Sequence, residues 1–327
     1  MFVREKVIKA ILDSGENFMS GEQLSKKLGI SRTAVWKHIN ALREEGYNIE
    51  SVNKKGYRLA EKPDDILSSE NIAYNLPTEF IGKKVIHLDT VGSTNDYAKE
   101  IGNKVSGGTL IISEQQTKGK GRLGRVWKSK SGDGIWMSLI IKPKIEPYKA
   151  PFLTLVAGAS VVKALSNLDV EASIKWPNDI IVHNKKICGI LTELSAEMER
   201  VNYVVIGIGI NIKTIDFPDE IKEKATSLYK EGYKLSRVDI VRQFCIEFEK
   251  LYKGYILDGN KQDTLELCRK YSAIIGKQVY VIKNNKRELV KCIDINENGN
   301  LIVKEKNGEM QEIMSGEVSI RGVKGYV

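Results

Sequence analysis

The chain is 327 residues long and carries 51 Lys or Arg against 42 Asp or Glu, a formal net charge of +9. That length suits two or three domains, each able to bury a core, and the modest basic excess favours polyanionic partners. Four widely spaced cysteines with no CxxC pair, and only three histidines, indicate neither a disulfide framework nor a metal site.

Residues 1–62 are predicted to form a DNA-binding domain. Apolar residues at helical spacing mark a first helix, Ser20 opens a capping box before a second helix, and Gly29 ends it. Ser31 can cap a third helix after a short turn that contains glycine, which is the pattern of a helix-turn-helix. Residues 49–59 add a hairpin with a basic tip, so the segment is predicted to be a winged helix.

The third helix and the hairpin tip carry the candidate DNA contacts. The exposed helix face mixes donors that can read base edges with cations that can meet phosphate, and the tip lysines suit backbone contacts. Residues 1–62 hold 12 basic and 8 acidic residues, a disproportionate share of the net charge. The alternative is a helical interaction domain that never meets DNA. The candidate residues are Arg32, Thr33, Trp36, Lys37, Asn40, Lys54 and Lys55.

Pro63-Asp64-Asp65 is predicted to be a linker, and residues 66–270 alternate strand-like and helix-like segments. Residues 150–168 are apolar nearly all round, which predicts a central helix packed on a sheet. An amphipathic helix is expected at 236–255. The expected strands are residues 85–88, 109–112, 135–141, 179–182, 186–193 and 203–212.

A basic loop follows the strand at 109–112. From Lys118 to Lys130 it holds six Lys or Arg, no acid and three glycines, Gly119, Gly121 and Gly124. Glycine permits close backbone approach and positive φ, so backbone N–H groups and cations here are predicted to bind an anion. The alternative is a solvated surface loop. The spacing formally matches a dinucleotide fingerprint, but no helix-like segment follows. A P-loop has Lys-Ser/Thr directly after its last glycine, and here Gly124 is followed by Arg125-Val126.

From residue 271 to 327 the helical pattern gives way to short strands and turns, which suggests a small closed β-barrel. Residues 1–6 lack the apolar core of a signal peptide, and the apolar run 152–162 is too short to span a bilayer. We therefore expect a soluble, cytoplasmic protein with no membrane partner.

Four stretches, in this order and behind a winged helix, resemble the bifunctional biotin–protein ligase and biotin operon repressor family. They are Ser93-Thr94-Asn95, the loop from Gln116 to Arg125, Lys175-Trp176-Pro177-Asn178-Asp179 with the following Lys186-Ile187-Cys188-Gly189, and Gly207-Ile208-Gly209-Ile210-Asn211. The resemblance covers essentially the whole chain and implies an α+β fold. Its expected parts are a winged helix-turn-helix at 1–62, a mixed α/β ligase domain at 66–270 and an SH3-like β-barrel at 271–327.

The resemblance implies a two-step reaction. Biotin and ATP, with Mg²⁺, form biotinyl-5′-AMP and pyrophosphate, and a lysine of a biotin carboxyl carrier protein then takes the biotin. It also implies that the adenylate promotes a homodimer on operator DNA. The candidate catalytic residues are Arg122, Lys186 and Asp179. The candidate biotin contacts are Ser93, Thr94, Asn95, Gln116, Lys120, Gly121, Arg122, Trp136 and Lys186. The candidate ATP contacts are Gly119, Arg122, Arg125, Trp127, Lys175, Asn178, Asn211 and Arg321.

Several of these residues also have structural interpretations. Ser93 and Thr94 can form a helix N-cap, Asp179 can be a turn residue after Pro177, and Asn211 can close a strand rich in glycine. Arg321 can form a surface ion pair. In addition, Lys120 stands where many members of the family have Arg, and Lys lacks the bidentate guanidinium, which puts its direct role in doubt.

Two other functions compete with this interpretation. A lipoate–protein ligase has a similar fold and the same adenylation logic, although the basic loop and the fused winged helix favour biotin. A ligand-sensing repressor without catalysis is the other possibility, and the joint presence of Arg122, Lys186 and Asp179 argues against it.

Overall fold

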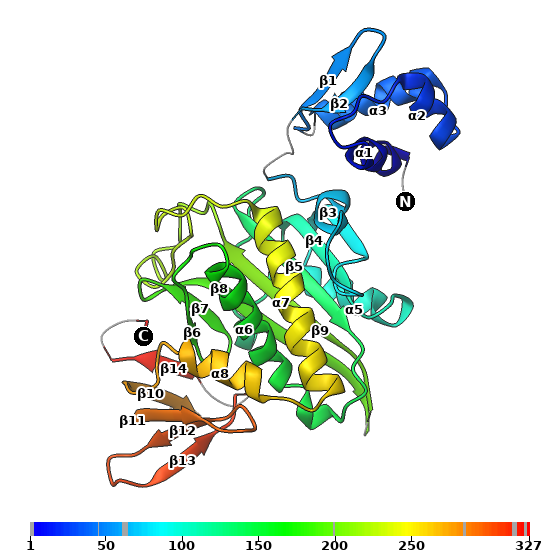
Figure 1. The fold of residues 1–327 in the computed structure, drawn as a ribbon. Coiled ribbons are helices and arrows are strands. Elements are labelled where there is room, and N and C mark those ends of the chain that lie inside the picture. The colour runs from blue at the N-terminus through cyan, green and yellow to red at the C-terminus, as the bar shows by residue number, and fades with distance from the viewer. Residues whose placement is uncertain are drawn as a thin grey trace. The chain divides into compact units, whose positions relative to one another are not determined.

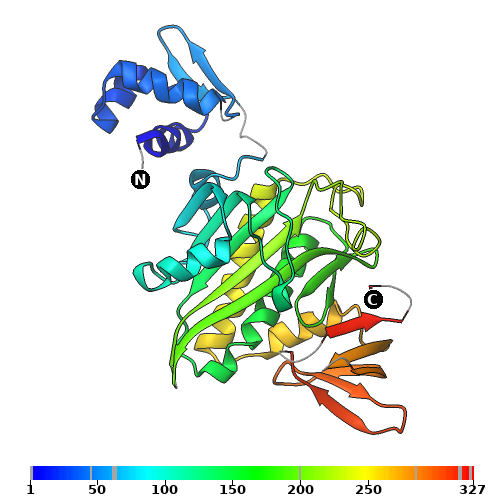
Figure 2. The same ribbon diagram turned by 180° about the vertical axis from the view of Figure 1, so that it is seen from behind.

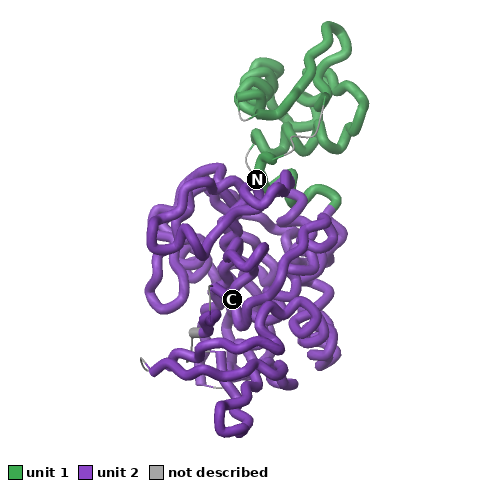
Figure 3. Tube along the Cα trace, turned by 90° about the vertical axis from the view of Figure 1, so that its left-hand side faces the viewer, with its two compact units in different colours: residues 1–75 green, residues 76–327 purple. Residues whose placement is uncertain are grey.

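The computed structural model describes residues 3–44, 46–60, 65–198, 200–283, 286–315, 319–323 and 326–327. The chain divides into two compact units, residues 1–75 and 76–327 (Figure 3). Pro63 and Asp64 of the predicted linker lie outside the described residues. The first unit extends past the predicted winged helix, because it includes the short helix α4 (Ser69–Ala73).

The first unit is a winged helix, as the sequence predicts. It contains α1 (Val3–Asp13), α2 (Gly21–Leu28), α3 (Arg32–Glu44) and an antiparallel hairpin of β1 (Ile49–Val52) and β2 (Gly56–Leu59). The predicted capping box is present, since Ser20 N donates to Gln23 Oε1 at 2.7 Å and Gln23 N to Ser20 Oγ at 3.1 Å. Gly29 ends α2 with a φ of 67°, a left-handed value that glycine adopts freely.

Apolar side chains from the three helices and the hairpin form the core of this unit. Val7, Ile11, Leu24 and Ile39 are fully buried. α4 is tied to the same core, because the hydroxyl of Tyr74 donates to Leu12 O at 3.0 Å. The segment after the wing is therefore part of the first unit.

The second unit is built on a seven-stranded sheet with the order β3-β4-β5-β9-β8-β7-β6. β3 and β4 are parallel, and all other neighbours are antiparallel. The predicted strands are confirmed. β3 and β4 continue several residues past the expected ends, and β8 and β9 extend into a common hairpin. The bounds are β3 (Val85–Val91), β4 (Thr109–Gln116), β5 (Gly134–Ile141), β6 (Ser173–Lys175), β7 (Asp179–Val182), β8 (Lys185–Glu197) and β9 (Arg200–Asn211).

Two helices, α6 (Phe152–Ser166) and α7 (Arg237–Leu257), lie side by side on one face of this sheet (Figures 1 and 2). α6 is buried on nearly all sides, as its uniform apolar character predicts. The stretch Pro147–Ser166 is long and apolar enough to cross a membrane, but 72% of its most apolar window is buried inside the protein. It is therefore the core helix of this unit. α5 (Thr94–Ile101) begins directly after Ser93.

The two faces of the sheet differ along β8 and β9. Because side chains alternate between faces, Ile190, Ile208 and Ile210 point to the core, and Gly189, Gly207 and Gly209 point to the opposite face. A Cβ on Gly207 would lie 2.1 Å from Asn95 Oδ1, and one on Gly209 2.5 Å from Trp127 Nε1. The repeated glycines thus give other side chains room to lie directly on the sheet.

The C-terminal region contains α8 (Gln262–Lys270) and a five-stranded antiparallel sheet with the order β13-β12-β11-β10-β14. It is joined to the central sheet by Trp176, whose Nε1 donates to Gly299 O at 2.9 Å. The predicted small β domain is confirmed, with β13 and β14 as the edge strands of the sheet that the structure describes. The bounds are β10 (Gln278–Lys283), β11 (Lys286–Ile295), β12 (Leu301–Lys304), β13 (Met310–Ile313) and β14 (Ser319–Gly322).

Candidate functional site

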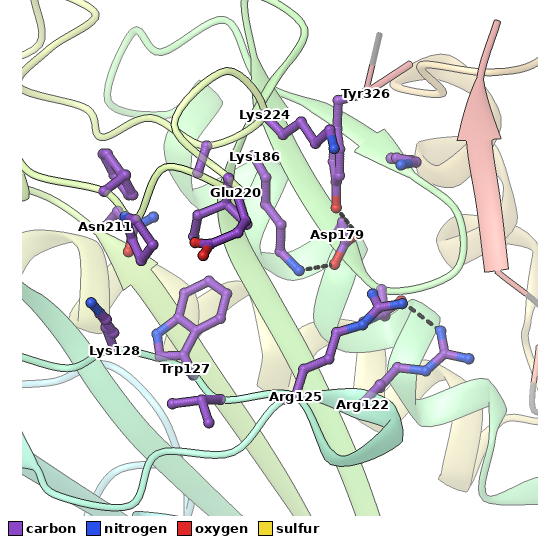
Figure 4. Close-up of a pocket in the computed structure, with 18 of the residues that line it drawn as sticks. Arg122, Arg125, Trp127, Lys128, Asp179, Lys186, Asn211, Glu220, Lys224 and Tyr326 are labelled. Atoms are coloured by element: carbon purple, nitrogen blue, oxygen red, sulfur yellow. Dashed lines mark hydrogen bonds and ion pairs between the residues drawn. The ribbon is translucent and has the colours of Figure 1, made fainter.

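A cavity of about 550 Å³ lies where the basic loop, β7, β8 and the C-terminal end of the chain meet (Figure 4). Its lining is rich in cations, with two carboxylates, Asp216 and Glu220, on the segment after β9. Clustered cations of this kind suit a polyanionic ligand such as a nucleotide triphosphate. The lining includes the predicted ATP contacts Arg122, Arg125, Trp127, Lys175, Asn178, Asn211 and Arg321, together with Asp179 and Lys186.

A second, smaller cavity of about 50 Å³ adjoins the first. Arg122, Lys186, Trp127 and Asn178 border both cavities and so stand at their junction. The lining of the small cavity includes every predicted biotin contact but one: Ser93, Thr94, Asn95, Gln116, Lys120, Gly121, Arg122 and Lys186. The predicted biotin contacts therefore gather around the small cavity, and most predicted ATP contacts around the large one, with residues of both sets on the shared border.

Trp136 is the predicted biotin contact that borders neither cavity. It lies on the glycine-rich face of the sheet, because it pairs with Gly209, but it is only 1% exposed. Its Nε1 donates to Lys130 O at 3.1 Å, so the basic loop covers it. Trp127 borders both cavities and gives them an apolar wall, and its ring lies against the paired Gly189 and Gly209.

The basic loop uses its three glycines in different ways. A Cβ on Gly119 would lie 2.3 Å from Trp127 O, and Gly124 has a φ of +73°, so both positions require glycine. Gly121 has no such close contact, and its N–H donates to Arg125 O at 2.7 Å. The expectation that all three glycines free N–H groups for an anion is therefore wrong for Gly121 in this conformation. Gly119 itself borders neither cavity.

Arg122 connects three parts of the chain at the junction. Its Nη1 donates to Asn178 Oδ1 at 2.6 Å, and its Nη2 donates to Ser315 O in the C-terminal domain at 2.7 Å. Burial lowers the pKa of its guanidinium, and the charge of Asp179 opposes this shift. Arg122 remains charged at any ordinary pH, and its fork of donors is already oriented.

Lys186 and Asp179 form an ion pair on neighbouring strands, with Nζ 2.5 Å from Oδ1. Burial disfavours the Asp179 carboxylate, but Lys186, the hydroxyl of Tyr326 and Lys175 outweigh burial, so the pKa of Asp179 lies below its usual value. The Lys186 ammonium also lies 5.2 Å from the ring centroid of Trp127. A carboxylate thus holds this cation at the point where the cavities meet.

Lys175 is 2% exposed, and within the part of the chain that the structure describes its Nζ has no hydrogen-bond partner. Its pKa is lowered to about 7, chiefly by burial and also by the nearby cations Arg321, Lys186 and Arg125, against the opposing charge of Asp179. The ring of Tyr326 covers the ammonium, 3.3 Å from Nζ to the centroid. Nothing in the sequence analysis pointed to Tyr326, which comes from the last two residues of the chain.

The polar residues of the small cavity form a connected network. Gln116 Oε1 accepts from Thr94 N at 2.8 Å and from Thr94 Oγ1 at 3.0 Å. Ser138 donates to Asn95 Oδ1 at 2.6 Å, and Asn95 Nδ2 donates to Glu193 Oε2 at 2.8 Å. No sequence motif points to Ser138 or Glu193, because only the packed sheet brings them to Asn95.

Two of the structural interpretations agree with contacts in this region. Ser93 Oγ accepts from Asp96 N at 3.4 Å, which is an N-cap for α5, although Ser93 also lines the small cavity. Asn211 Nδ2 donates to Thr226 O at 3.1 Å and borders the large cavity. Lys120 pairs with Asp96 at 2.6 Å.

The DNA-contact candidates lie on one surface of the first unit. Arg32, Thr33, Trp36 and Lys37 are exposed on α3, and Asn40 is half-buried beside them. The opposite face of α3 packs into the core. Lys54 and Lys55 are exposed at the tip of the β1–β2 hairpin. Among the described residues, no group of three or more His, Cys, Asp or Glu side chains could hold a metal ion.

Comparison with known proteins agrees with this division. A model of the biotin/lipoate A/B protein ligase family matches residues 88–211, a helix-turn-helix domain model matches 3–58, and a biotin protein ligase C-terminal domain model matches 274–321. The bifunctional ligase/repressor BirA of Bacillus subtilis is 41% identical over 323 residues, covering 97% of this chain and 98% of the relative. BirA of Escherichia coli is 31% identical, covering 96% of each. The structure of the Aquifex aeolicus biotin protein ligase in complex with biotin and ATP matches with a TM-score of 0.65 at 31% identity, covering 73% of this chain and 99% of that one.

Proposed function

This chain belongs to the family of bifunctional biotin ligase/repressors, and from that premise we propose how its residues carry out both activities. The protein is an ATP-dependent biotin–protein ligase with a DNA-binding repressor domain. One observation carries the assignment of residues to the chemistry. All the predicted biotin contacts except Trp136 line the small cavity, all the predicted ATP contacts except Gly119 line the large one, and the two cavities share Arg122 and Lys186.

In the first step, a carboxylate oxygen of biotin attacks the α-phosphorus of ATP. The bond to the bridging oxygen breaks, pyrophosphate leaves, and biotinyl-5′-AMP remains. The approach sets two anions in contact, and two unit charges about 4 Å apart repel by about 4 kcal/mol at an effective dielectric of about 20. Arg122 and Lys186 lie where these anions would meet, and oriented cations offset this repulsion without a proton transfer.

In the second step, the neutral amine of a lysine in the biotin carboxyl carrier protein attacks the acyl carbon of the adenylate. An amide forms, AMP leaves with the bonding electrons, and the proton of the amine passes to solvent. The proposed role of the enzyme here is to hold the adenylate and to keep water from the anhydride until the carrier arrives.

Biotin is proposed to occupy the small cavity, with Ser93, Thr94 and Gln116 near its ureido ring. In the described conformation that cavity, about 50 Å³, has room for only a few water molecules. We therefore propose that the basic loop moves to admit biotin and that Trp127 leaves its position on Gly189 and Gly209. Equal protease sensitivity of residues 117–130 with and without biotin and ATP would contradict this step.

Mg²⁺ is proposed to bind together with ATP. Asp216 and Glu220 line the large cavity, and magnesium commonly binds through one or two carboxylates plus substrate phosphates. These two residues would hold the ion, which would neutralise charge on the β- and γ-phosphates. Arg125 and Arg321 border the same cavity and are proposed to bind the phosphates directly.

The repressor activity is proposed to use the exposed face of α3 for base edges and the wing lysines for phosphates. One winged helix offers few contacts, so we propose a homodimer on an inverted repeat, favoured by the bound adenylate. Both activities are proposed to take place in the cytoplasm.

Release of pyrophosphate from ATP in the presence of biotin, followed by labelling of a carrier lysine, tests the ligase activity. The competing lipoate ligase is distinguished by thermal stabilisation, since only the true ligand should raise the unfolding temperature. Pyrophosphate release with lipoate but not with biotin would overturn the assignment. No preference for the biotin-gene promoter over random DNA at physiological salt would overturn the repressor assignment.

A further inference from the structure

Tyr326 lies inside the large cavity, although it comes from the C-terminal end of the chain (Figure 4). The residue is 9% exposed. Its hydroxyl donates a hydrogen bond to Asp179 Oδ2, and its ring covers the ammonium of Lys175. It therefore contacts two residues of the Lys175–Asp179 stretch, and Asp179 lies 147 residues earlier in the sequence.

The hydroxyl completes the binding of Asp179. Oδ1 of that carboxylate pairs with Lys186 Nζ at 2.5 Å, and Oδ2 accepts from Tyr326. A carboxylate held through both oxygens keeps one orientation, because rotation of the group would break both contacts. Hydrogen bonds to charged groups are stronger than those between neutral groups. Tyr326 thus contributes to where the Lys186 ammonium stands between the two cavities.

The ring provides Lys175 with a partner in place of water. Lys175 is 2% exposed, and its Nζ has no hydrogen-bond partner among the described residues. The π face of an aromatic ring attracts a cation. The charged groups that act on this ammonium are Asp179, Arg321, Lys186 and Arg125, of which only Asp179 is an anion. The ring also stands over the ammonium at 3.3 Å, so Lys175 has no open path to a phosphate in this arrangement.

We propose that Tyr326 is a positioning residue for adenylate formation. Its hydroxyl fixes Asp179 and, through it, the Lys186 ammonium, and its ring covers the buried Nζ of Lys175 behind Asp179. This inference rests on the proposed ligase function. It also replaces the direct ATP contact expected of Lys175 with an action through Asp179.

Two substitutions in the full-length protein separate the hydroxyl from the ring. Tyr326→Phe removes only the hydroxyl and should slow single-turnover adenylate formation about tenfold, the effect of one hydrogen bond to a charged group, with the KM for ATP within about twofold of wild type. Tyr326→Ala also admits water to Lys175. Where adenylate formation depends on the charge of Lys175, its rate should fall as pH rises through about 7 in the wild type and in Tyr326→Phe. In Tyr326→Ala, water reaches the ammonium and raises its pKa, so the fall should come at a higher pH.

Tyr255→Phe is the matched control, because Tyr255 is also buried and its hydroxyl donates to Lys149 O at 3.1 Å, away from both cavities. It should keep the wild-type rate. A wild-type rate in Tyr326→Phe overturns the inference, and so does an equal loss in Tyr255→Phe. Thermal unfolding of each variant shows whether the fold is kept, and if Tyr326→Ala does not fold, Tyr326→Phe alone decides. A wild-type protein that forms no adenylate overturns the proposed function instead.

Discussion

Replacing Lys186 with Ala removes one of the two cations, Arg122 and Lys186, that border both cavities. Because its ammonium is fixed by Asp179 before any ligand binds, its loss should resemble the loss of one preorganised stabilising group. Such a loss costs about 2.7–4 kcal/mol of transition-state stabilisation, or roughly 10²- to 10³-fold in the rate of adenylate formation. Rapid-quench measurement of biotinyl-5′-AMP with saturating biotin and ATP gives this rate directly.

The same substitution also affects stability, and this effect must be separated from catalysis. Lys186→Ala leaves the Asp179 carboxylate buried with the hydroxyl of Tyr326 and without its paired ammonium. Breaking a buried ion pair on one side costs about 3–5 kcal/mol, and here we expect the lower part of that range because the Tyr326 hydrogen bond remains. The midpoint of thermal unfolding should therefore fall by about 6–10 °C for a domain of this size.

The double variant Lys186→Ala/Asp179→Asn separates the two effects. Removing the unpaired negative charge should restore most of the lost stability, but adenylate formation should stay slow because the cation is still absent. If Lys186→Ala forms adenylate at the wild-type rate, the reasoning is wrong. It is also wrong if the double variant recovers activity together with stability, because the loss would then have come from the fold.

Three further outcomes follow from the described contacts. Burial disfavours the Glu114 carboxylate, but His87 and Arg237 outweigh burial and lower its pKa to about 2. Glu114→Gln should therefore reduce the free energy of unfolding at neutral pH by about 3 kcal/mol. That stability is present above pH 4.5 and is lost as pH falls toward 2, so urea unfolding should show the gap between wild type and variant narrowing over this range. Replacing Lys54 and Lys55 with Ala should weaken binding to all DNA sequences alike. The slope of the logarithm of the binding constant against the logarithm of the salt concentration should become shallower by about one to two units per protomer. A loss of binding confined to the operator would contradict the phosphate role. Arg122→Ala breaks the contacts to Asn178 and Ser315 and should release biotinyl-5′-AMP into solution faster than the wild type does. Dialysis of the labelled adenylate would detect this release, and retention equal to that of the wild type would refute the prediction.

Local signals explain why much of the fold was predictable. Ser20 with its capping partner, Gly29 after α2 and the uniformly apolar α6 each depend on neighbours within a few residues, and the structure confirms them. The boundary after the wing was harder. α4 joins the first unit through the hydroxyl of Tyr74, and no local pattern records that contact with Leu12.

The site was predictable where whole motifs converge. Arg122 and Lys186 come from two motifs, and the structure brings both to the same junction. Trp136 and Trp127 show the limit. Both rings lie on the glycine-rich face, but the packing of the basic loop buries Trp136 and leaves Trp127 as a wall of the cavities. The packing of a loop produces no periodic pattern in the sequence, so this difference could not be predicted.

Tyr326 could not be found from the sequence. Its contact with Asp179 joins residues 147 positions apart, and a single tyrosine near a chain end has no motif. Gly121 shows the opposite error. Its place in a repeated glycine pattern suggested a free N–H group, but the folded loop uses that group to bind Arg125 O.

The most direct test is native mass spectrometry of the full-length protein after incubation with biotin, ATP and Mg²⁺. If the two cavities hold biotin and ATP and meet at Arg122 and Lys186, the chain should retain one biotinyl-5′-AMP, and Lys186→Ala should retain far less after the same time. An unchanged mass for the wild type, with no pyrophosphate released, would contradict the account.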